Sequence, residues 1–194
     1  MTDAPPPPIA PPSAPRPIVR VVLLGYMTSG KSTVGQALAR RLEWRFLDFD
    51  VEIERREGRT IGDLVLDDGQ ERLRELEAAL TAEVAETPFV VLAPGGGWIT
   101  RPELLRMLGG DTLAVWLKVS PEETARRLKA DIIDRPFREL DDPVPRIAEM
   151  IAAREDLYRL ADLSIPTDGR STESIAYEIE TIVRMRALAA FAPP

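Results

Sequence analysis

Short apolar runs alternate with longer segments of mixed polarity along this chain. The apolar runs have the length of strands and lie at 18–24, 45–48, 89–93, 112–117 and 163–165. The segments between them carry hydrophobic residues every three or four positions, which is the spacing of amphipathic helices. We predict helices over 33–42, 51–57, 71–86, 101–108, 120–130, 146–160 and 172–190, with a short helix from Thr60 and a turn at 67–69. Strands that alternate with helices predict an α/β fold, in which a parallel sheet is covered on both faces and functional groups collect at the carboxyl ends of its strands.

Proline marks two parts of the chain as irregular. Residues 1–17 are rich in proline, so we predict a disordered or polyproline-like tail, with a passive role favoured over partner binding. The globular domain is predicted over 18–190. Within it, residues 131–145 are polar and contain Pro136, Pro143 and Pro145, and an irregular loop of this length is often an active-site lid.

Composition narrows the chemistry that the chain can perform. Its 194 residues are 44% hydrophobic and 29% charged, which fits one globular domain. The formal net charge of −7 argues against a nucleic-acid partner. Cysteine and histidine are both absent, so acid–base work falls to carboxylates, lysine or tyrosine. No apolar run approaches the roughly 20 residues of a membrane span, and the amino terminus lacks the pattern of a secretory signal. We therefore expect a cytoplasmic protein without a membrane partner.

The first predicted strand runs into the stretch Gly25-Tyr26-Met27-Thr28-Ser29-Gly30-Lys31-Ser32-Thr33, which has the phosphate-loop pattern G-x-x-x-x-G-K-S. A strand before this motif and a helix after it are the context in which it binds phosphates, whereas a glycine turn with a chance lysine is the alternative. Lys31 would supply charge to the terminal phosphates, and Ser32 would supply a hydroxyl to Mg²⁺. The ATP contacts expected from the loop are Gly25, Met27, Thr28, Ser29, Gly30, Lys31, Ser32 and Thr33.

Two aspartates follow the second predicted strand, at positions 48 and 50. A Mg–ATP site needs an acid near the metal, directly or through water. A hydroxyl acceptor needs an acid that orients it and takes its proton. Asp48 and Asp50 fit these two needs, with capping of the following helix as the alternative.

Two further features are candidates for binding an anionic small molecule. Arg74 and Glu77 are three residues apart and share one helix face. The arginine would grip a carboxylate with its guanidinium group, although spacing alone favours an ordinary surface ion pair. Gly95-Gly96-Gly97 follows a buried strand, which suggests that a ligand approaches the main chain and accepts hydrogen bonds from it. A strained loop is the alternative.

Arginines lie in and around the predicted lid. Arg135 falls within it, where it would neutralise charge on the transferred phosphoryl group when the lid closes. Arg126 and Arg127 come near the end of the helix before the lid. One of them is expected over the adenine of ATP, and interaction with the helix dipole explains them nearly as well. Arg154 follows in the next predicted helix, near Tyr158, to which we assign no chemistry.

In combination these motifs resemble the shikimate kinases, a family within the nucleoside monophosphate kinase-like group, over about residues 19–168. A phosphate loop alone is common, but this set of motifs in this order is much more specific. The matched motifs are the phosphate loop at 25–33, D-x-D at 48–50, R-x-x-E at 74–77, the triple glycine at 95–97, the lid R-P at 135–136 and R-x-P-L-Y at 154–158.

The resemblance implies a three-layer α/β/α P-loop domain with a flexible lid, whose five-stranded parallel sheet has the order 2-3-1-4-5. It implies transfer of the γ-phosphoryl group of ATP to the 3-hydroxyl of shikimate, with Mg²⁺, and we expect a monomer. The implied catalytic residues are Lys31, Asp50 and Arg135. Ser32 would hold the metal, with Asp48 acting through water. Arg127 and Arg135 would join the loop in binding ATP, and the substrate would be bound by Asp50, Arg74, Glu77, Gly95, Gly96, Gly97 and Arg154.

The chain departs from the family pattern around the expected acceptor pocket. Larger side chains stand at 49, 98 and 137 and smaller ones at 65 and 73, so we expect a rebuilt apolar wall. The departures are Phe49, Val65, Leu73, Pro94, Trp98, Phe137 and Asp156.

Three hypotheses about function follow from these residues. The first is a shikimate kinase, and the second is a related kinase for another hydroxy acid or a polyol such as gluconate. The third is a nucleotide-binding regulatory module that transfers no phosphate. Retention of Lys31, Ser32, Asp48 and Asp50 argues against the third, since a pure binding module needs no base.

Overall fold

Five parallel strands form one sheet in the order β2-β3-β1-β4-β5 in the computed structural model, which describes residues 16–130 and 141–190. The strands are β1 (Arg20–Leu24), β2 (Arg45–Asp48), β3 (Val90–Ala93), β4 (Thr112–Lys118) and β5 (Leu163–Pro166). The helices are α1 (Lys31–Leu42), α2 (Phe49–Glu57), α3 (Ile61–Val84), the 3-10 helix η1 (Trp98–Thr100), α4 (Glu103–Met107), α5 (Pro121–Ala130), α6 (Val144–Ala152), α7 (Glu155–Tyr158) and α8 (Thr172–Ala190). The predicted α/β fold and the implied strand order are confirmed.

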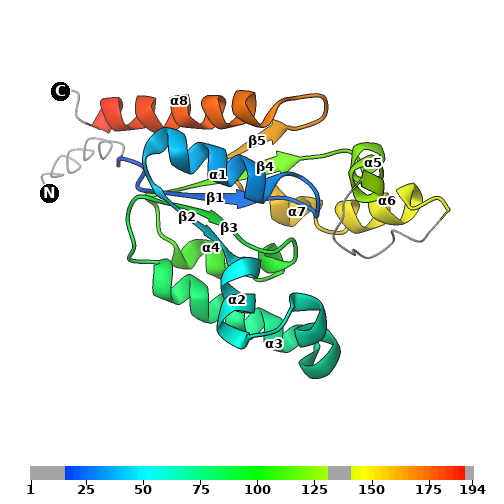
Figure 1. Ribbon diagram of the computed structural model, residues 1–194. Helices are drawn as coiled ribbons and strands as arrows, with labels where there is room; N and C mark the ends of the chain where they lie inside the picture. The colour runs from blue at the N-terminus through cyan, green and yellow to red at the C-terminus, as the bar shows by residue number, and fades with distance from the viewer. Residues whose placement is uncertain (1–15, 131–140, 191–194) are drawn as a thin grey trace, which may run out of the picture.

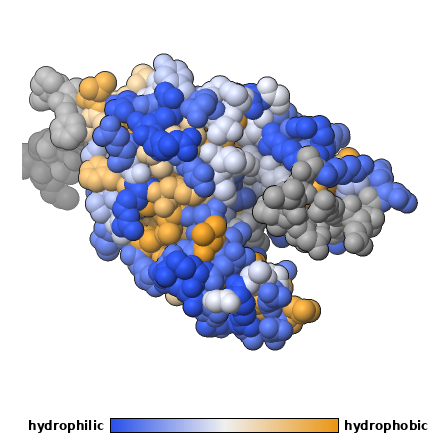
Figure 2. All heavy atoms as spheres, in the orientation of Figure 1, coloured by the Kyte–Doolittle hydropathy of each residue, from blue (hydrophilic) through white to orange (hydrophobic). Residues whose placement is uncertain are grey.

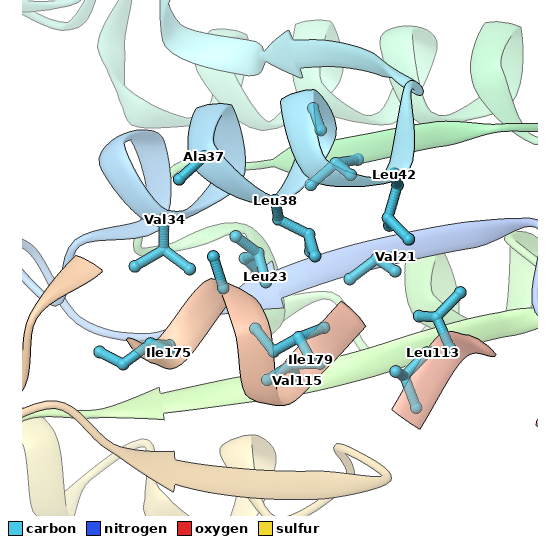
Figure 3. Close-up of a cluster of buried hydrophobic side chains, with 14 of the residues drawn as sticks. Val21, Leu23, Val34, Ala37, Leu38, Leu42, Leu113, Val115, Ile175 and Ile179 are labelled. Atoms are coloured by element: carbon cyan, nitrogen blue, oxygen red, sulfur yellow. The ribbon is translucent and has the colours of Figure 1, made fainter. Parts of the chain in front are cut away.

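Helices cover both faces of the sheet and make a three-layer domain (Figure 1). Helices α1 and α8 lie on one face, and α3 and α4 lie on the other. Successive residues of a strand point to opposite faces, so Val21 and Leu23 pack under α1 and α8 (Figure 3), while Val22 and Leu24 belong to the cluster on the α3 side. Both faces of β1 are therefore buried, which is why the stretch 21–24 is continuously apolar.

The carboxyl ends of the strands share one edge of the sheet. In Figure 2 the surface is indented between the lobe of α2 and α3 and the end that carries α5 and α6. The strands run toward this side of the molecule in Figure 1. Among the described helices, none has both the length and the apolar composition that crossing a membrane would require.

The turn predicted at 67–69 is confirmed as a kink, because Gly69, with φ 84° and ψ 167°, has non-helical backbone and divides α3 into two helical parts. One helix prediction differs from the structure. The single helix predicted over 146–160 is wrong, since α6 ends at Ala152 and Arg154 stands at φ −116° before α7 begins. Helix α6 also begins at Val144, inside the segment predicted to be irregular. The proline-rich residues 1–15 and residues 131–140 of the predicted lid lie outside the described part of the chain, and the proposed domain limits stay predictions.

Candidate active site

The loop between β1 and α1 folds tightly at the carboxyl edge of the sheet. The Ser29 amide donates to Tyr26 O at 3.2 Å. Gly25 has φ 149°, and a Cβ there would lie 2.6 Å from Ser29 Oγ and 2.7 Å from Leu117 O, so only glycine fits. Lys31 begins α1 and folds back over the loop, where its Nζ donates to Gly25 O at 2.9 Å and to Tyr26 O at 3.1 Å. The first amides of α1 therefore face the same space as the lysine, which is the arrangement of an anion site.

A cleft of about 430 Å³ opens beside this loop. It brings together the carboxyl ends of β1, β2 and β3, as expected for a parallel sheet. The structure thus unites the predicted loop residues with both aspartates and with part of the glycine loop. The residues that line the cleft are Met27, Thr28, Gly30, Lys31, Ser32, Thr33, Asp48, Asp50, Ala93, Pro94, Gly96, Arg126 and Arg127.

Asp48 uses its two carboxylate oxygens for two purposes. Its Oδ1 accepts from the amides of Asp50 at 3.1 Å and Val51 at 3.4 Å, so it caps α2. Its Oδ2 accepts from Ser32 Oγ at 2.5 Å. A hydroxyl and a carboxylate side by side are the hard oxygen ligands that Mg²⁺ prefers. No group of three or more acidic residues able to hold a metal occurs in the described part of the chain. The pair therefore fits an ion that takes its other ligands from phosphates and water.

Arg74 and Glu77 form a buried ion pair. The Arg74 side chain is 16% exposed and that of Glu77 is 0% exposed, so the surface pair favoured by spacing alone is wrong. Burial raises the pKa of Glu77, and the nearby Arg74 guanidinium opposes this rise. Glu77 Oε1 has no hydrogen-bond partner among the residues described. A buried carboxylate oxygen left in this state is suited to a ligand hydroxyl or a water molecule.

The triple glycine lies against these side chains. Gly97 has φ −96°, and neither Gly95 nor Gly96 is among the glycines with positive φ, so none of the three has the left-handed backbone conformation that would indicate a strained loop. A Cβ on Gly95 would lie 2.7 Å from Glu77 Oε1 and 3.0 Å from Asp50 Oδ1. A Cβ on Gly97 would overlap the Arg74 guanidinium. The glycines therefore let the loop close onto Asp50, Arg74 and Glu77.

Arg154 and Tyr158 reach the same loop from the opposite side. Arg154 Nη1 donates to Gly96 O at 3.4 Å, and its guanidinium lies 5.9 Å from the centre of the Tyr26 ring. The Tyr158 hydroxyl donates to Gly96 O at 3.2 Å, and its ring stacks on Trp116. Burial raises the pKa of Tyr158, so it remains a neutral donor. Sequence reasoning assigned Tyr158 no role, although its four-residue distance from Arg154 was an available signal.

Arg127 lines the cleft and joins three parts of the fold. It donates to Thr28 O at 2.9 Å and to Thr167 O at 3.2 Å, and it pairs with Glu123 at 2.7 Å. Helix-dipole matching alone does not account for these contacts. Arg135 lies outside the described residues, so its predicted role stays a prediction.

The ion pair between Glu123 and Arg127 can be tested through the pH dependence of stability. Hydrogen bonds from Arg126 and Arg127 lower the pKa of Glu123 from 4.5 to about 2. A carboxyl whose pKa falls on folding stabilises the protein above its unfolded-state pKa, and the contribution is lost as pH falls through the folded-state value. We expect Glu123→Gln to lower Tm by about 2 °C at pH 7 and by less at pH 3.5. Thermal melts of both proteins at the two pH values measure this, and an equal gap at both would contradict it.

Two large side chains expected in the wall of the acceptor pocket are core residues instead. Phe49 is 0% exposed and Trp98 is 1% exposed, and both pack in the cluster between the sheet and α3. Trp98 Nε1 donates to Thr81 Oγ1 at 2.9 Å. These substitutions therefore fill the interior beneath the loop, while Phe137 lies outside the described residues.

Proteins with these features are known. A family model described as shikimate kinase matches residues 27–184. A shikimate kinase of Thermus thermophilus is 38% identical over 165 residues, which is 85% of this chain and 90% of that protein. A shikimate kinase of Geobacter sulfurreducens is 40% identical over 84% of this chain and 90% of its own length.

Solved structures agree with the sequence relatives. Shikimate kinase from Acinetobacter baumannii, in complex with shikimate, has a TM-score of 0.79 at 30% identity over 88% of this chain and 96% of that one. The Bacteroides thetaiotaomicron enzyme has a TM-score of 0.77 at 31% identity over 86% of this chain and 98% of that one. A gluconokinase from Sinorhizobium meliloti, at 19% identity and a TM-score of 0.60, shares the fold alone. This chain belongs to the shikimate kinase family.

Proposed function

We propose that this chain transfers the γ-phosphoryl group of ATP to the 3-hydroxyl of shikimate. One observation carries the proposal. Arg74, Glu77 and Arg154 converge on the glycine loop beside Asp50, and Asp50 lines the same cleft as Lys31. This arrangement supports a two-substrate site in which an anionic hydroxy acid faces a nucleotide phosphate chain.

The donor half of the site follows from the phosphate loop. Loop amides and the start of α1 would bind the β- and γ-phosphates, with Lys31 moving from its main-chain partners to their oxygens. A second cavity, of about 350 Å³, is lined by residues that include Thr28, Arg127, Thr167 and Arg170, and it suits the adenosine end. Ser32, and Asp48 through water, would hold Mg²⁺, which when bound supplies positive charge to the β- and γ-phosphates.

The acceptor half of the site provides a base and a clamp. Asp50 would accept the proton of the acceptor hydroxyl. At the same time the oxygen of that hydroxyl would form the new bond to the γ-phosphorus, and the bond from the γ-phosphorus to the β–γ bridging oxygen would break. Arg74 and Arg154 would hold the carboxylate, and the amides of 95–97 would donate to the ring hydroxyls. Lys31 would balance the charge on the group in transfer, joined by Arg135 when the lid closes.

The proposal includes a monomeric enzyme in the cytoplasm. Gluconate is the second candidate acceptor, since it also offers a carboxylate and hydroxyls to the same arginines. A regulatory module without transfer is disfavoured because Asp50 is kept beside the acceptor loop, 3.0 Å from the Cβ position of Gly95.

A coupled ADP-release assay tests the proposal with Mg–ATP and, separately, shikimate, quinate, gluconate and no acceptor. Turnover with shikimate at least tenfold above every other condition is the expected result, by the specificity expected of a site built to hydrogen-bond its substrate. Turnover with gluconate or quinate but not with shikimate would show that the acceptor is that compound and not shikimate. Tight ATP binding with no turnover would point to the regulatory module.

The glycine loop gives a further prediction about acceptor binding. Gly97→Ala is expected to raise the KM for shikimate about tenfold or more and to leave the KM for ATP nearly unchanged, because the new methyl group displaces Arg74. Gly110→Ala is the matched control, since a Cβ at Gly110 would have nothing within 4 Å. Steady-state kinetics of both variants measure these KM values. An equal rise in the KM for shikimate in the two variants would show that the clash with Arg74 is not the cause.

A further inference from the structure

A buried chain of hydrogen bonds links the segment after the glycine loop to α3. Trp98 Nε1 donates to Thr81 Oγ1 at 2.9 Å, and the Thr81 hydroxyl donates to Glu77 O at 2.7 Å. Trp98 is 1% exposed and Thr81 is 0% exposed. Because bulk water does not reach these groups, neither bond can be exchanged for one to solvent, and loss of the hydroxyl would leave the indole N–H unpaired.

Both ends of this chain lie next to residues of the acceptor half. On the loop side, the Trp98 amide donates to Gly95 O at 3.0 Å, so the indole is anchored to the turn that carries the glycines. On the helix side, Thr81 lies about one turn beyond Glu77, and positions 74, 77 and 81 share one face of α3. The Trp98–Thr81 bond therefore sets the distance between the Arg74–Glu77 pair and the glycine loop.

A second contact ties the same two elements on the other side of the pair. Arg101, just after η1, donates from Nη1 to Arg74 O at 3.5 Å and pairs with Glu71. Its side chain is 30% exposed, so water and salt weaken this contact relative to the buried one. Arg74 and Glu77 thus lie between an exposed tether and a buried tether. The buried one is the firmer constraint.

We propose that Trp98 and Thr81 are positioning residues that set the affinity for the acceptor. They act by holding α3 in the position, relative to the glycine loop, at which Arg74 and Glu77 contact the acceptor. The inference rests on the proposed function in one respect, that the acceptor binds at Arg74. The proposed nucleotide contacts come from the loop after β1 and from α5, to which this tether makes no bond. The test can therefore distinguish an effect on acceptor binding from an effect on nucleotide binding.

The test uses three single variants of the full chain. Thr81→Val keeps the shape of the side chain and removes the hydroxyl, and Thr81→Ser restores it. Thr124→Val is the matched control, because Thr124 is also 0% exposed and its hydroxyl has no hydrogen-bond partner among the described residues. Each protein is assayed for kcat and for the KM values of shikimate and ATP. Hydrogen exchange by mass spectrometry follows residues 71–81 and 95–101.

Thr81→Val is expected to raise the KM for shikimate about tenfold, with the KM for ATP within about twofold of the wild type. Exchange should accelerate in both segments together, Thr81→Ser should return each value close to that of the wild type, and Thr124→Val should change neither segment. The inference is overturned if Thr81→Val matches Thr124→Val in acceptor KM and exchange, or if both KM values rise together. A wild type that does not turn over shikimate would reject the proposed function, and the exchange data would still decide whether the tether exists.

Discussion

Replacing Asp50 with asparagine is expected to lower kcat by about 10³-fold, within the range of about 10²–10⁴ for a positioned general base. The amide has the size of the carboxylate but does not take a proton from the acceptor hydroxyl. Asp50 lies in the first turn of α2, and Asp48 rather than Asp50 caps that helix. The fold should therefore survive the change, with KM values altered much less than kcat. Rapid-quench measurement of single-turnover rates would show that the chemical step is the one affected.

Asp156 supplies the control for this experiment. Its side chain is 96% exposed and pairs with Arg159 on the surface. Asp156→Asn makes the same chemical change and should leave kcat within about twofold, as surface substitutions usually do. If Asp50→Asn retained a rate near that of Asp156→Asn, Asp50 would be no base, and the acceptor hydroxyl would lose its proton to another group.

Arg74→Ala should raise the KM for shikimate about 100-fold. In the proposed complex Arg74 pairs with the substrate carboxylate, and loss of one partner of a buried, hydrogen-bonded charge pair across a binding interface costs about 2–5 kcal/mol. The KM for ATP should change little, since the proposed nucleotide contacts come from the loop after β1 and not from α3. Arg72→Ala is the matched control on the same helix. Arg72 is 43% exposed and pairs with Glu75 at 3.2 Å. An unchanged KM for shikimate in Arg74→Ala would show that Arg74 does not bind the substrate carboxylate.

The same variant should show a characteristic pH dependence of stability. In the wild type, burial raises the pKa of Glu77 and Arg74 opposes the rise. Without Arg74, the folded-state pKa of Glu77 rises further above its unfolded value. Stability from such a group is complete below the unfolded pKa and is lost as pH rises through the folded one. The difference in Tm between Arg74→Ala and the wild type should therefore widen between pH 5 and pH 8.

The sheet could be predicted because its three central strands are mostly apolar on both faces. Val21 to Leu24 face alternate helical layers and all are buried, so the run has no polar interruption, and β3 and β4 are also largely buried. Both aspartates and the phosphate loop follow directly from strand ends, and so their meeting in one cleft could also be expected.

Long-range contacts explain what could not be predicted. Nothing in the stretch 150–158 marks a helix end, yet the helix breaks at Arg154, which contacts Gly96, as Tyr158 also does. Spacing alone could not tell that Arg74 and Glu77 are buried, because the glycine loop that covers them lies about twenty residues further along the chain. Trp98 is a further case, because the sequence does not tell whether a large side chain next to a site lines the pocket or fills the core beneath it.

We expect the γ-phosphoryl group of ATP to pass directly to the 3-hydroxyl of shikimate. Incubation with ATP labelled by ¹⁸O at the non-bridging γ-positions, followed by mass spectrometry and ³¹P NMR of the products, measures this transfer. The expected product is shikimate 3-phosphate that carries the whole γ-label, with the oxygen bonded to carbon unlabelled. Labelled inorganic phosphate without phosphorylated shikimate, or a phosphate on another hydroxyl, would rule out direct transfer to the 3-hydroxyl.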